Sequence, residues 1–180
     1  MKVGHVLYVL RVAFRVWISC LQHDRAAKLN RAITAHTPAN RFVTFFLTVF
    51  DPLASTLTYC NAGHNPPLLL RANGTVERLE EGGMVLGLFG AAGFEDKTVS
   101  FGPGDLLILY SDGVVEACAV HCEEEFGEER LATVARGCGS LPLPQVIEKI
   151  VESLRAWAGE GTFADDVTIV LARRSADHQC

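Results

Sequence analysis

The sequence predicts an α+β fold in which a layered antiparallel β-sandwich is flanked by helices. Apolar residues recur at helical spacing near both ends of the chain, whereas its middle consists of short β-rich runs separated by turn residues. The chain has 180 residues, of which 49% are hydrophobic, so it is long enough to bury one core. Helices on both sides of a series of strands indicate sheets inside and helices covering them.

The opening segment, Val3 to Leu21, is predicted to be a helix that packs on a sheet, because its apolar residues share one broad face. Arg11 and Arg15 interrupt it and would lie deep in hydrocarbon if it crossed a membrane, and no small-residue cleavage site follows. A helix on the membrane surface is the less favoured alternative, since the polar face is thin and poor in lysine. We therefore expect Phe14 and Trp17 to be buried and expect no membrane partner.

A second, shorter helix is predicted from Asp24 to about Ala35. Ala26, Leu29 and Ile33 share one side of it, and Asp24 is available as its cap. Pro38 is expected to end it.

Three hairpins are predicted in succession after this helix. In each, two β-rich runs flank a turn signal, of which Asn73-Gly74 is the strongest. The other two turns are Asp51-Pro52 and Gly102-Pro103-Gly104. The paired runs are Arg41–Phe50 with Thr56–Cys60, Leu68–Arg71 with Thr75–Leu79, and Phe94–Phe101 with Asp105–Tyr110.

Two helices and a last strand complete the predicted domain. The helices are expected at Phe126 to about Ala135 and at Pro142–Trp157, and the strand at Val167–Ala172. We predict one domain over residues 1–174 and a frayed tail over 175–180.

Charge and cysteine content limit the partners and the compartment. The net charge of -5, with both signs mixed along the chain, leaves no basic stripe for nucleic acid. The irregular spacing of the six cysteines favours reduced thiols and a cytoplasmic location. The cluster Cys118, His121 and Cys122 lacks the second pair of ligands that a structural zinc site needs, which disfavours zinc.

Two acidic motifs stand out because of their positions. Leu106–Tyr110 is a continuous apolar run, typical of a buried strand, and it leads directly into Asp112-Gly113. An acid there projects from a rigid support into a loop, where metal ligands are well held. Asp165-Asp166 precedes the last strand, and hard divalent cations prefer such oxygen ligands. A plain turn and surface acids are the alternatives, but the two motifs together favour a metal site.

The loop Asn61–Pro67 is the densest loop signature, with Gly63 supplying backbone freedom and two prolines fixing the exit. His64 in this loop is a candidate general acid, ligand or hydrogen-bonded loop anchor. The anchor role is favoured, because no second histidine lies nearby at metal-ligand spacing.

Taken together, these motifs resemble those of the PPM-type metal-dependent protein serine/threonine phosphatases, in their SpoIIE-like bacterial branch. Their order and spacing carry the resemblance, which covers nearly the whole chain. The matching segments are Arg41–Thr44, Asn61–Pro67, Leu86-Gly87, Pro103–Asp105, Leu109–Val114, Glu116-Ala117, Phe126-Gly127 and Asp165–Thr168.

The resemblance implies a central β-sandwich, two manganese or magnesium ions, and hydrolysis of phosphoserine or phosphothreonine in a regulatory protein, such as an antagonist of an anti-sigma factor. Asp112 and Asp165 match catalytic metal ligands of the family, with Asp166 as a neighbouring ligand. His64, Asn65 and Gly113 match positions that contact substrate or anchor a loop.

The start of the chain departs from the family pattern, since Gly4-His5-Val6 stands at the family's early turn and Met1 where a metal-binding aspartate is expected. We therefore expect the first strands to be lacking, an incomplete metal site and impaired activity. Uncovered apolar surface would favour association, for example as a homodimer. The alternative is a catalytically inactive module of the same fold that binds phosphoproteins.

Overall fold

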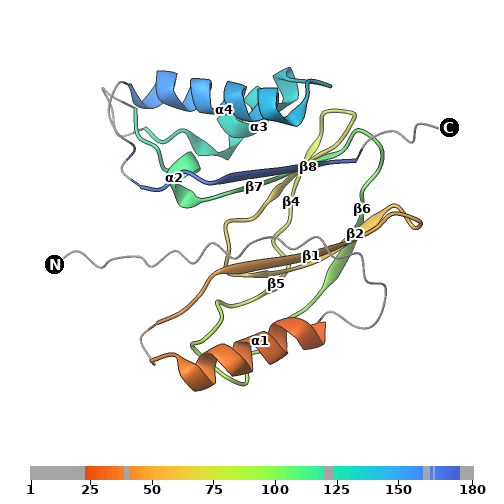
Figure 1. Cartoon of the computed structure of the whole chain (residues 1–180), viewed down its shortest axis with the longest axis vertical. Coiled ribbons are helices and arrows are strands. Elements are labelled where there is room, and N and C mark those ends of the chain that lie inside the picture. Colours follow the sequence, from red (N-terminus) through yellow and green to blue (C-terminus); the bar gives the residue numbers. More distant parts are fainter. Residues whose placement is uncertain (1–22, 39–40, 120–123, 160–162, 164, 175–180) are drawn as a thin grey trace.

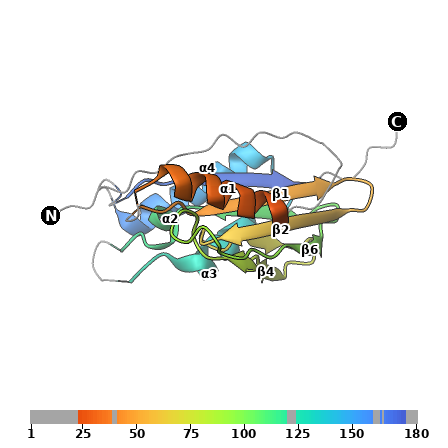
Figure 2. The same ribbon diagram turned by 90° about the horizontal axis from the view of Figure 1, so that it is seen from below.

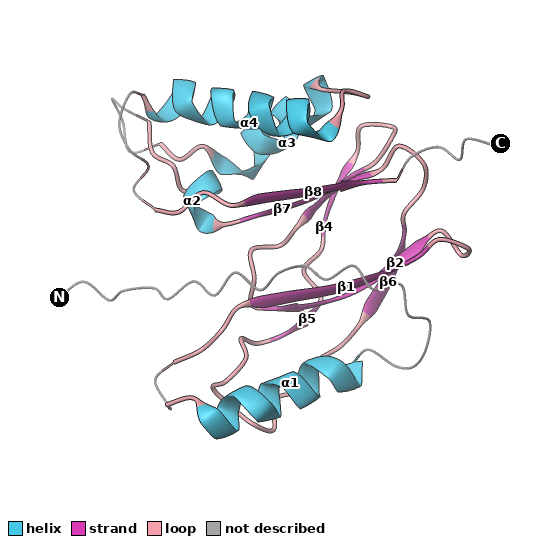
Figure 3. Ribbon diagram, viewed as in Figure 1, coloured by secondary structure: helices cyan, strands magenta, loops and turns pink. Residues whose placement is uncertain are grey.

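The computed structural model describes residues 23–38, 41–119, 124–159, 163 and 165–174. Two sheets lie face to face between layers of helices (Figure 1, Figure 3). Helix α1 (His23–His36) covers one sheet, while α3 (Gly127–Gly137) and α4 (Leu143–Ala158) cover the other. The α+β sandwich flanked by helices is thus confirmed. The helix predicted over 3–21 and the tail over 175–180 lie outside the described residues.

The first sheet is built around β2 (Thr56–Ala62). Strand β1 (Phe45–Asp51) pairs antiparallel with its whole length, from Phe45 opposite Ala62 to Asp51 opposite Thr56. The other edge of β2 pairs antiparallel with β6 (Lys97–Ser100) and, over two residues, parallel with β5 (Gly82–Gly83). The β1–β2 hairpin confirms the first predicted hairpin, whereas the short parallel strand was not predicted.

The second sheet has the strand order β4-β3-β7-β8 and is antiparallel throughout. Its strands are β3 (Leu68–Leu70), β4 (Val76–Arg78), β7 (Leu106–Tyr110) and β8 (Ile169–Arg173). The hairpin around Asn73-Gly74 is confirmed. The Asn73 side chain accepts a hydrogen bond from the Thr75 N–H at 3.0 Å, which stabilises the turn.

The third predicted hairpin is wrong. Strand β6 pairs with β2 in the first sheet, whereas β7 lies between β3 and β8 in the second. The turn at 102–104 therefore carries the chain from one sheet to the other. A turn signal reports only that the chain reverses locally, and strand pairing is decided by distant residues.

Strand β7 is buried on both faces, which explains its unbroken apolar run. Leu106, Ile108 and Tyr110 pack with α3 and α4 in one core cluster, while Leu107 and Leu109 pack between the two sheets in another. Burial on both faces gives a continuous apolar strand instead of an alternating one. The strand that precedes Asp112 is therefore buried, as predicted.

Helix α1 lies across β1 and β2 on the outer face of the first sheet (Figure 2). Ala26, Leu29 and Ile33 face this core, as predicted. The predicted cap is wrong: the helix begins at His23, so Asp24 lies inside it. Its buried Asn30 fixes the loop between β5 and β6, because the side chain donates to the Phe89 carbonyl at 2.8 Å and accepts from the Gly87 N–H at 2.9 Å.

The other predicted helices and the last strand agree with the structure to within two residues at each end. Among the described residues, no helix is long and apolar enough to cross a membrane. The segment 3–21, for which the membrane prediction was made, lies outside the described residues.

Candidate functional site

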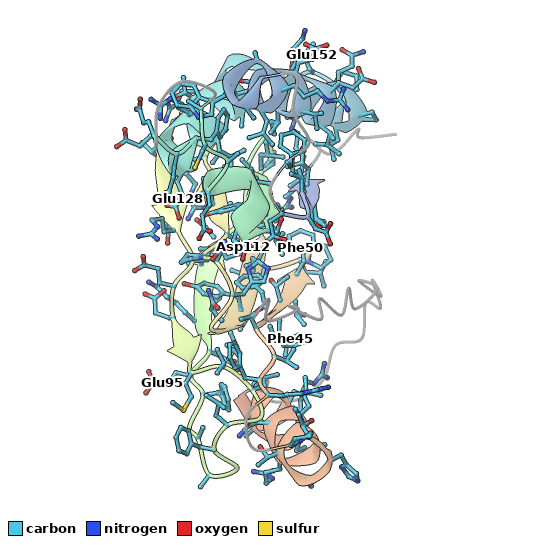
Figure 4. The ribbon with its side chains drawn as sticks, turned by 90° about the vertical axis from the view of Figure 1, so that its left-hand side faces the viewer. Phe45, Phe50, Glu95, Asp112, Glu128 and Glu152 are labelled. Carbon is cyan, nitrogen blue, oxygen red and sulfur yellow. The ribbon has the colours of Figure 1, made fainter. Side chains whose placement is uncertain are left out.

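The site lies at the end of the sandwich where β2 and β7 finish and β8 begins. Figure 4 looks at this end and shows Asp112 between the outer helical layers. Asp112 follows β7 almost directly and is the first residue of α2 (Asp112–Val115), a single helical turn. The expected loop is thus corrected to a helical turn, closed by a bond of 2.8 Å from the Glu116 N–H to the Asp112 carbonyl.

Ser111 connects this turn to the second acidic motif. Its hydroxyl donates to the Asp166 carbonyl at 2.8 Å and accepts from the Thr168 N–H at 2.9 Å. Its own N–H donates to the Thr168 carbonyl at 3.0 Å. No role was predicted for Ser111, because the segment after Tyr110 was expected to be a loop.

Gly113 lies directly against the second acidic motif. A Cβ atom at this position would lie 2.5 Å from the Asp166 carbonyl oxygen and 3.2 Å from the Asp165 carbonyl carbon, so only glycine fits without a shift of the backbone. The two acidic motifs are therefore adjacent although they are far apart in sequence. That their carboxylates converge on one cation stays a prediction.

Each acidic motif also makes a local hydrogen bond. Asp112 Oδ1 accepts from the Gly113 N–H at 2.9 Å, and Asp165 Oδ1 accepts from the Asp166 N–H at 2.7 Å. Asp165 and Asp166 are exposed, while Asp112 is half-buried. These bonds restrict the orientation of both carboxylates. Among the ion pairs of the described residues, none joins Asp112 or Asp165 to a lysine or an arginine.

The donor set fits a hard divalent cation in chemistry but supplies only part of a ligand shell. Carboxylate oxygens are the ligands that Mn²⁺ and Mg²⁺ favour. In the described part of the chain, however, no group of three or more His, Cys, Asp or Glu side chains could hold a metal ion. Further ligands could be water, backbone carbonyl oxygens or residues outside that part.

The loop that follows β2 is fixed by Asn61, which is buried. The Asn61 side chain accepts from the His64 N–H at 2.8 Å and donates to the His64 carbonyl at 2.9 Å. The His64 ring Nδ1 lies 2.7 Å from the Asn65 carbonyl. These contacts support an anchoring role within the loop, and they show that Asn61, which the sequence analysis did not single out, is its main polar support.

Tyr110 ties this loop to the acidic turn. Its hydroxyl lies 2.9 Å from the Pro66 carbonyl and 2.7 Å from a carboxylate oxygen of Glu128 in the first turn of α3, and Glu128 pairs with Arg78. Burial, followed by the hydrogen bond to Glu128, raises the pKa of Tyr110 far above its ordinary value. The phenol is therefore protonated at neutral pH and serves as a donor. A tyrosine in an apolar run gives no sequence signal of this role.

The described cysteines form no metal site. Cys60 and Cys138 are free and buried, and Cys118 is free and exposed. Burial raises the pKa of the Cys60 thiol to about 11. His121 and Cys122, the other members of the cluster considered for zinc, lie outside the described residues.

Known proteins with similar sequences include a phosphatase. The family described as Stage II sporulation protein E (SpoIIE) matches residues 3–175. Protein IcfG of Synechocystis sp. is 30% identical over 142 residues, covering 79% of this chain and 22% of IcfG. Phosphoserine phosphatase RsbU of Bacillus subtilis is 26% identical over 147 residues, covering 81% of this chain and 43% of RsbU. The chain thus spans less than half of either relative.

Solved structures with the same fold include phosphatase domains. The SiaA-PP2C domain of Pseudomonas aeruginosa superimposes with a TM-score of 0.73 at 22% identity, covering 84% of this chain and 60% of that one. The phosphatase domain of SpoIIE from Bacillus subtilis, presoaked with Mn, gives 0.61 at 17% identity, covering 91% and 79%. The family match over residues 3–175 shows that the chain belongs to the SpoIIE family, and the superpositions show that it has the fold of PPM-type phosphatase domains.

Proposed function

We propose that this domain hydrolyses phosphoserine or phosphothreonine in a regulatory protein, with a divalent cation held by Asp112, Asp165 and Asp166. The observation that carries the proposal is the junction of the two acidic motifs, where Ser111 bonds to the backbone on both sides of Val167 and Gly113 contacts Asp166. Residues separated by more than fifty positions are held together at one end of the sandwich. Acidic motifs held side by side on a rigid support are what a catalytic metal site requires, and we propose that their carboxylates converge there.

Manganese or magnesium would supply the chemistry, because a bound divalent cation lowers the pKa of water and polarises phosphoryl oxygens. Asp112, Asp165 and Asp166 would contribute the negative charge that holds the cation. Gly113 admits the close approach, while Asn61 and Tyr110 fix the adjacent loop. In this arrangement His64 and Asn65 present the loop to an incoming phosphoprotein. Slow turnover is expected of this chain, because its described acidic side chains form only part of a ligand set.

The proposed substrate is a phosphorylated protein of the type that antagonises an anti-sigma factor. Support comes from the relatives, which include a protein named phosphoserine phosphatase RsbU and a Mycobacterium tuberculosis protein with RsbU and RsbW domains, 25% identical to this chain with a TM-score of 0.65. A cytoplasmic location and a homodimer are further parts of the proposal, and sedimentation velocity would test the dimer.

A second candidate is a module that binds phosphoproteins without hydrolysing them. It is favoured by one observation, namely that the described residues contain no group of three or more side chains able to hold a metal ion. Such a module would keep the loop and the acidic turn but lack turnover.

The test is manganese-dependent release of phosphate from a phosphoserine protein, measured under single-turnover conditions so that slow hydrolysis is detected. We expect Asp112→Asn and Asp165→Asn each to reduce the rate at least about 100-fold, since even the outer partners of metal ligands contribute about 10- to 100-fold. Asp51→Asn is the matched control, because Asp51 ends β1 and its side chain accepts hydrogen bonds from the nearby N–H groups of Leu53 and Ala54 at 2.9 and 3.0 Å. Phosphoprotein binding without release of phosphate would favour the second candidate.

A further inference from the structure

We propose that Ser111 is a positioning residue of this site, and that its hydroxyl sets the spacing between Asp112 and the Asp165-Asp166 motif. The inference rests on the metal-dependent function proposed above. It concerns a side chain that is no ligand itself but that bonds to the backbone beside the ligands.

The hydroxyl of Ser111 does not cap the helix that follows it. Ser111 precedes α2 with an extended backbone, φ −84° and ψ 165°, which is the conformation of a capping residue. Its side chain nevertheless makes no cap hydrogen bond. It bonds instead to Asp166 and Thr168, across the gap between two chain segments.

These bonds extend the pairing of two strands beyond the point where their ladder ends. The last residue pair between β7 and β8 is Tyr110 with Ile169. One step further, the Ser111 N–H still reaches the Thr168 carbonyl, but the chain then turns into α2. Beyond this point the Ser111 hydroxyl donates to the Asp166 carbonyl and accepts from the Thr168 N–H. The backbone from Asp166 to Thr168 is therefore still bonded to the end of β7 where strand pairing has stopped.

The attachment lies next to the acidic side chains on both sides. Asp112 follows Ser111 in the chain, and the Asp166 carbonyl that Ser111 holds belongs to one of the proposed ligands. Removing the hydroxyl loosens the attachment of Asp166 to Asp112, because only the backbone bond from the Ser111 N–H to the Thr168 carbonyl then remains and the Gly113 contact opposes approach but not separation. Outer groups of this kind orient metal ligands and contribute about 10- to 100-fold to affinity.

The experiment compares Mn²⁺ binding by the whole 180-residue chain and its Ser111→Ala and Ser111→Thr variants, measured from the electron paramagnetic resonance signal of free Mn²⁺. We expect Ser111→Ala to weaken binding about tenfold and Ser111→Thr, which keeps the hydroxyl, to restore most of it. Thr48→Val is the matched control, because Thr48 donates a comparable bond of 3.2 Å to the Thr58 carbonyl in the other sheet. Hydrogen exchange of the Thr168 amide should quicken in Ser111→Ala alone.

Three results would overturn the inference, and they differ in what else they affect. If the unmodified chain binds Mn²⁺ and Ser111→Ala binds it equally well, Ser111 has no positioning role and the proposed function stands. If the unmodified chain binds no Mn²⁺, the proposed metal site fails and the inference fails with it. Equal weakening by Ser111→Ala and Thr48→Val would also count against a positioning role, since it would indicate a general loss of stability.

Discussion

At the scale of single residues, the contact between Gly113 and Asp166 controls how closely the acidic motifs can approach. Both groups at the contact are backbone atoms, so neither can rotate away from an added methyl group. Ser111 holds the same two segments together from the other direction. The two motifs can therefore neither approach nor separate easily, as a preorganised site requires.

We predict that Gly113→Ala destabilises the protein by about 1–3 kcal/mol through overpacking and weakens Mn²⁺ binding. The Cβ placed 2.5 Å from the Asp166 carbonyl oxygen must displace the segment that carries the acids. Urea unfolding and Mn²⁺ titration measure the two effects. Gly93→Ala is the control, since no atom lies within 4 Å of a Cβ there. If Gly113→Ala and Gly93→Ala had the same stability and the same Mn²⁺ affinity, the contact would contribute to neither.

At the scale of elements, the corner between β6 and β7 joins the two sheets. The buried Asp105 accepts hydrogen bonds from the N–H groups of Gly102 and Ala72, both at 2.9 Å, and pairs with Arg71 at 3.0 Å. One carboxylate thus satisfies donors from the corner itself and from the end of β3. These bonds stabilise a connection that lacks the pairing of a hairpin.

We predict that Asp105→Ala costs about 1–3 kcal/mol, because it leaves the N–H groups of Gly102 and Ala72 without their acceptor. The half-buried Arg71 loses one of its two carboxylate partners but keeps Glu77. The control is Glu152→Ala, which removes an exposed ion pair with Lys149 on α4 and should cost well under 1 kcal/mol. Urea unfolding gives both values. A cost for Asp105→Ala as small as that of the control would show that the corner is held by packing alone.

At the scale of the whole molecule, the first sheet contains an ionic cluster that links stability to pH. Glu81 accepts hydrogen bonds from Lys97 of β6 and from the buried hydroxyl of Tyr59 of β2. The bond from Lys97, followed by that from Tyr59, lowers the pKa of Glu81 from 4.5 to about 2. Because the folded pKa is depressed, the stabilisation is present above pH 4.5 and is lost as the pH falls towards 2.

Glu81→Gln should therefore lower the urea midpoint at pH 7 and reduce the loss of stability between pH 4.5 and 2. The effect is expected to be modest, because Glu81 is substantially exposed and solvent screens the pair. Glu152→Gln controls for the removal of one negative charge. If the variant and the unmodified chain lose stability in parallel over this pH range, the cluster does not contribute.

The sequence by itself determined the fold class and most elements, because these depend on local periodicity and turn chemistry. The helices at 23–36, 127–137 and 143–158, the buried strand before Asp112 and two of three hairpins follow from such patterns. The acidic motifs could also be identified as candidate metal ligands, because an acid at the end of an apolar run is recognisable from the local sequence alone.

Only the tertiary structure decided which distant segments meet. It showed that β6 and β7 belong to different sheets, that Gly113 lies against Asp166, and that the hydroxyls of Ser111 and Tyr110 bond to segments far away in the chain. A serine before a helix and a tyrosine in an apolar strand look the same whether their hydroxyls meet solvent, their own helix or another strand. The partner of a polar group is set by the packing of whole layers, which no local pattern records.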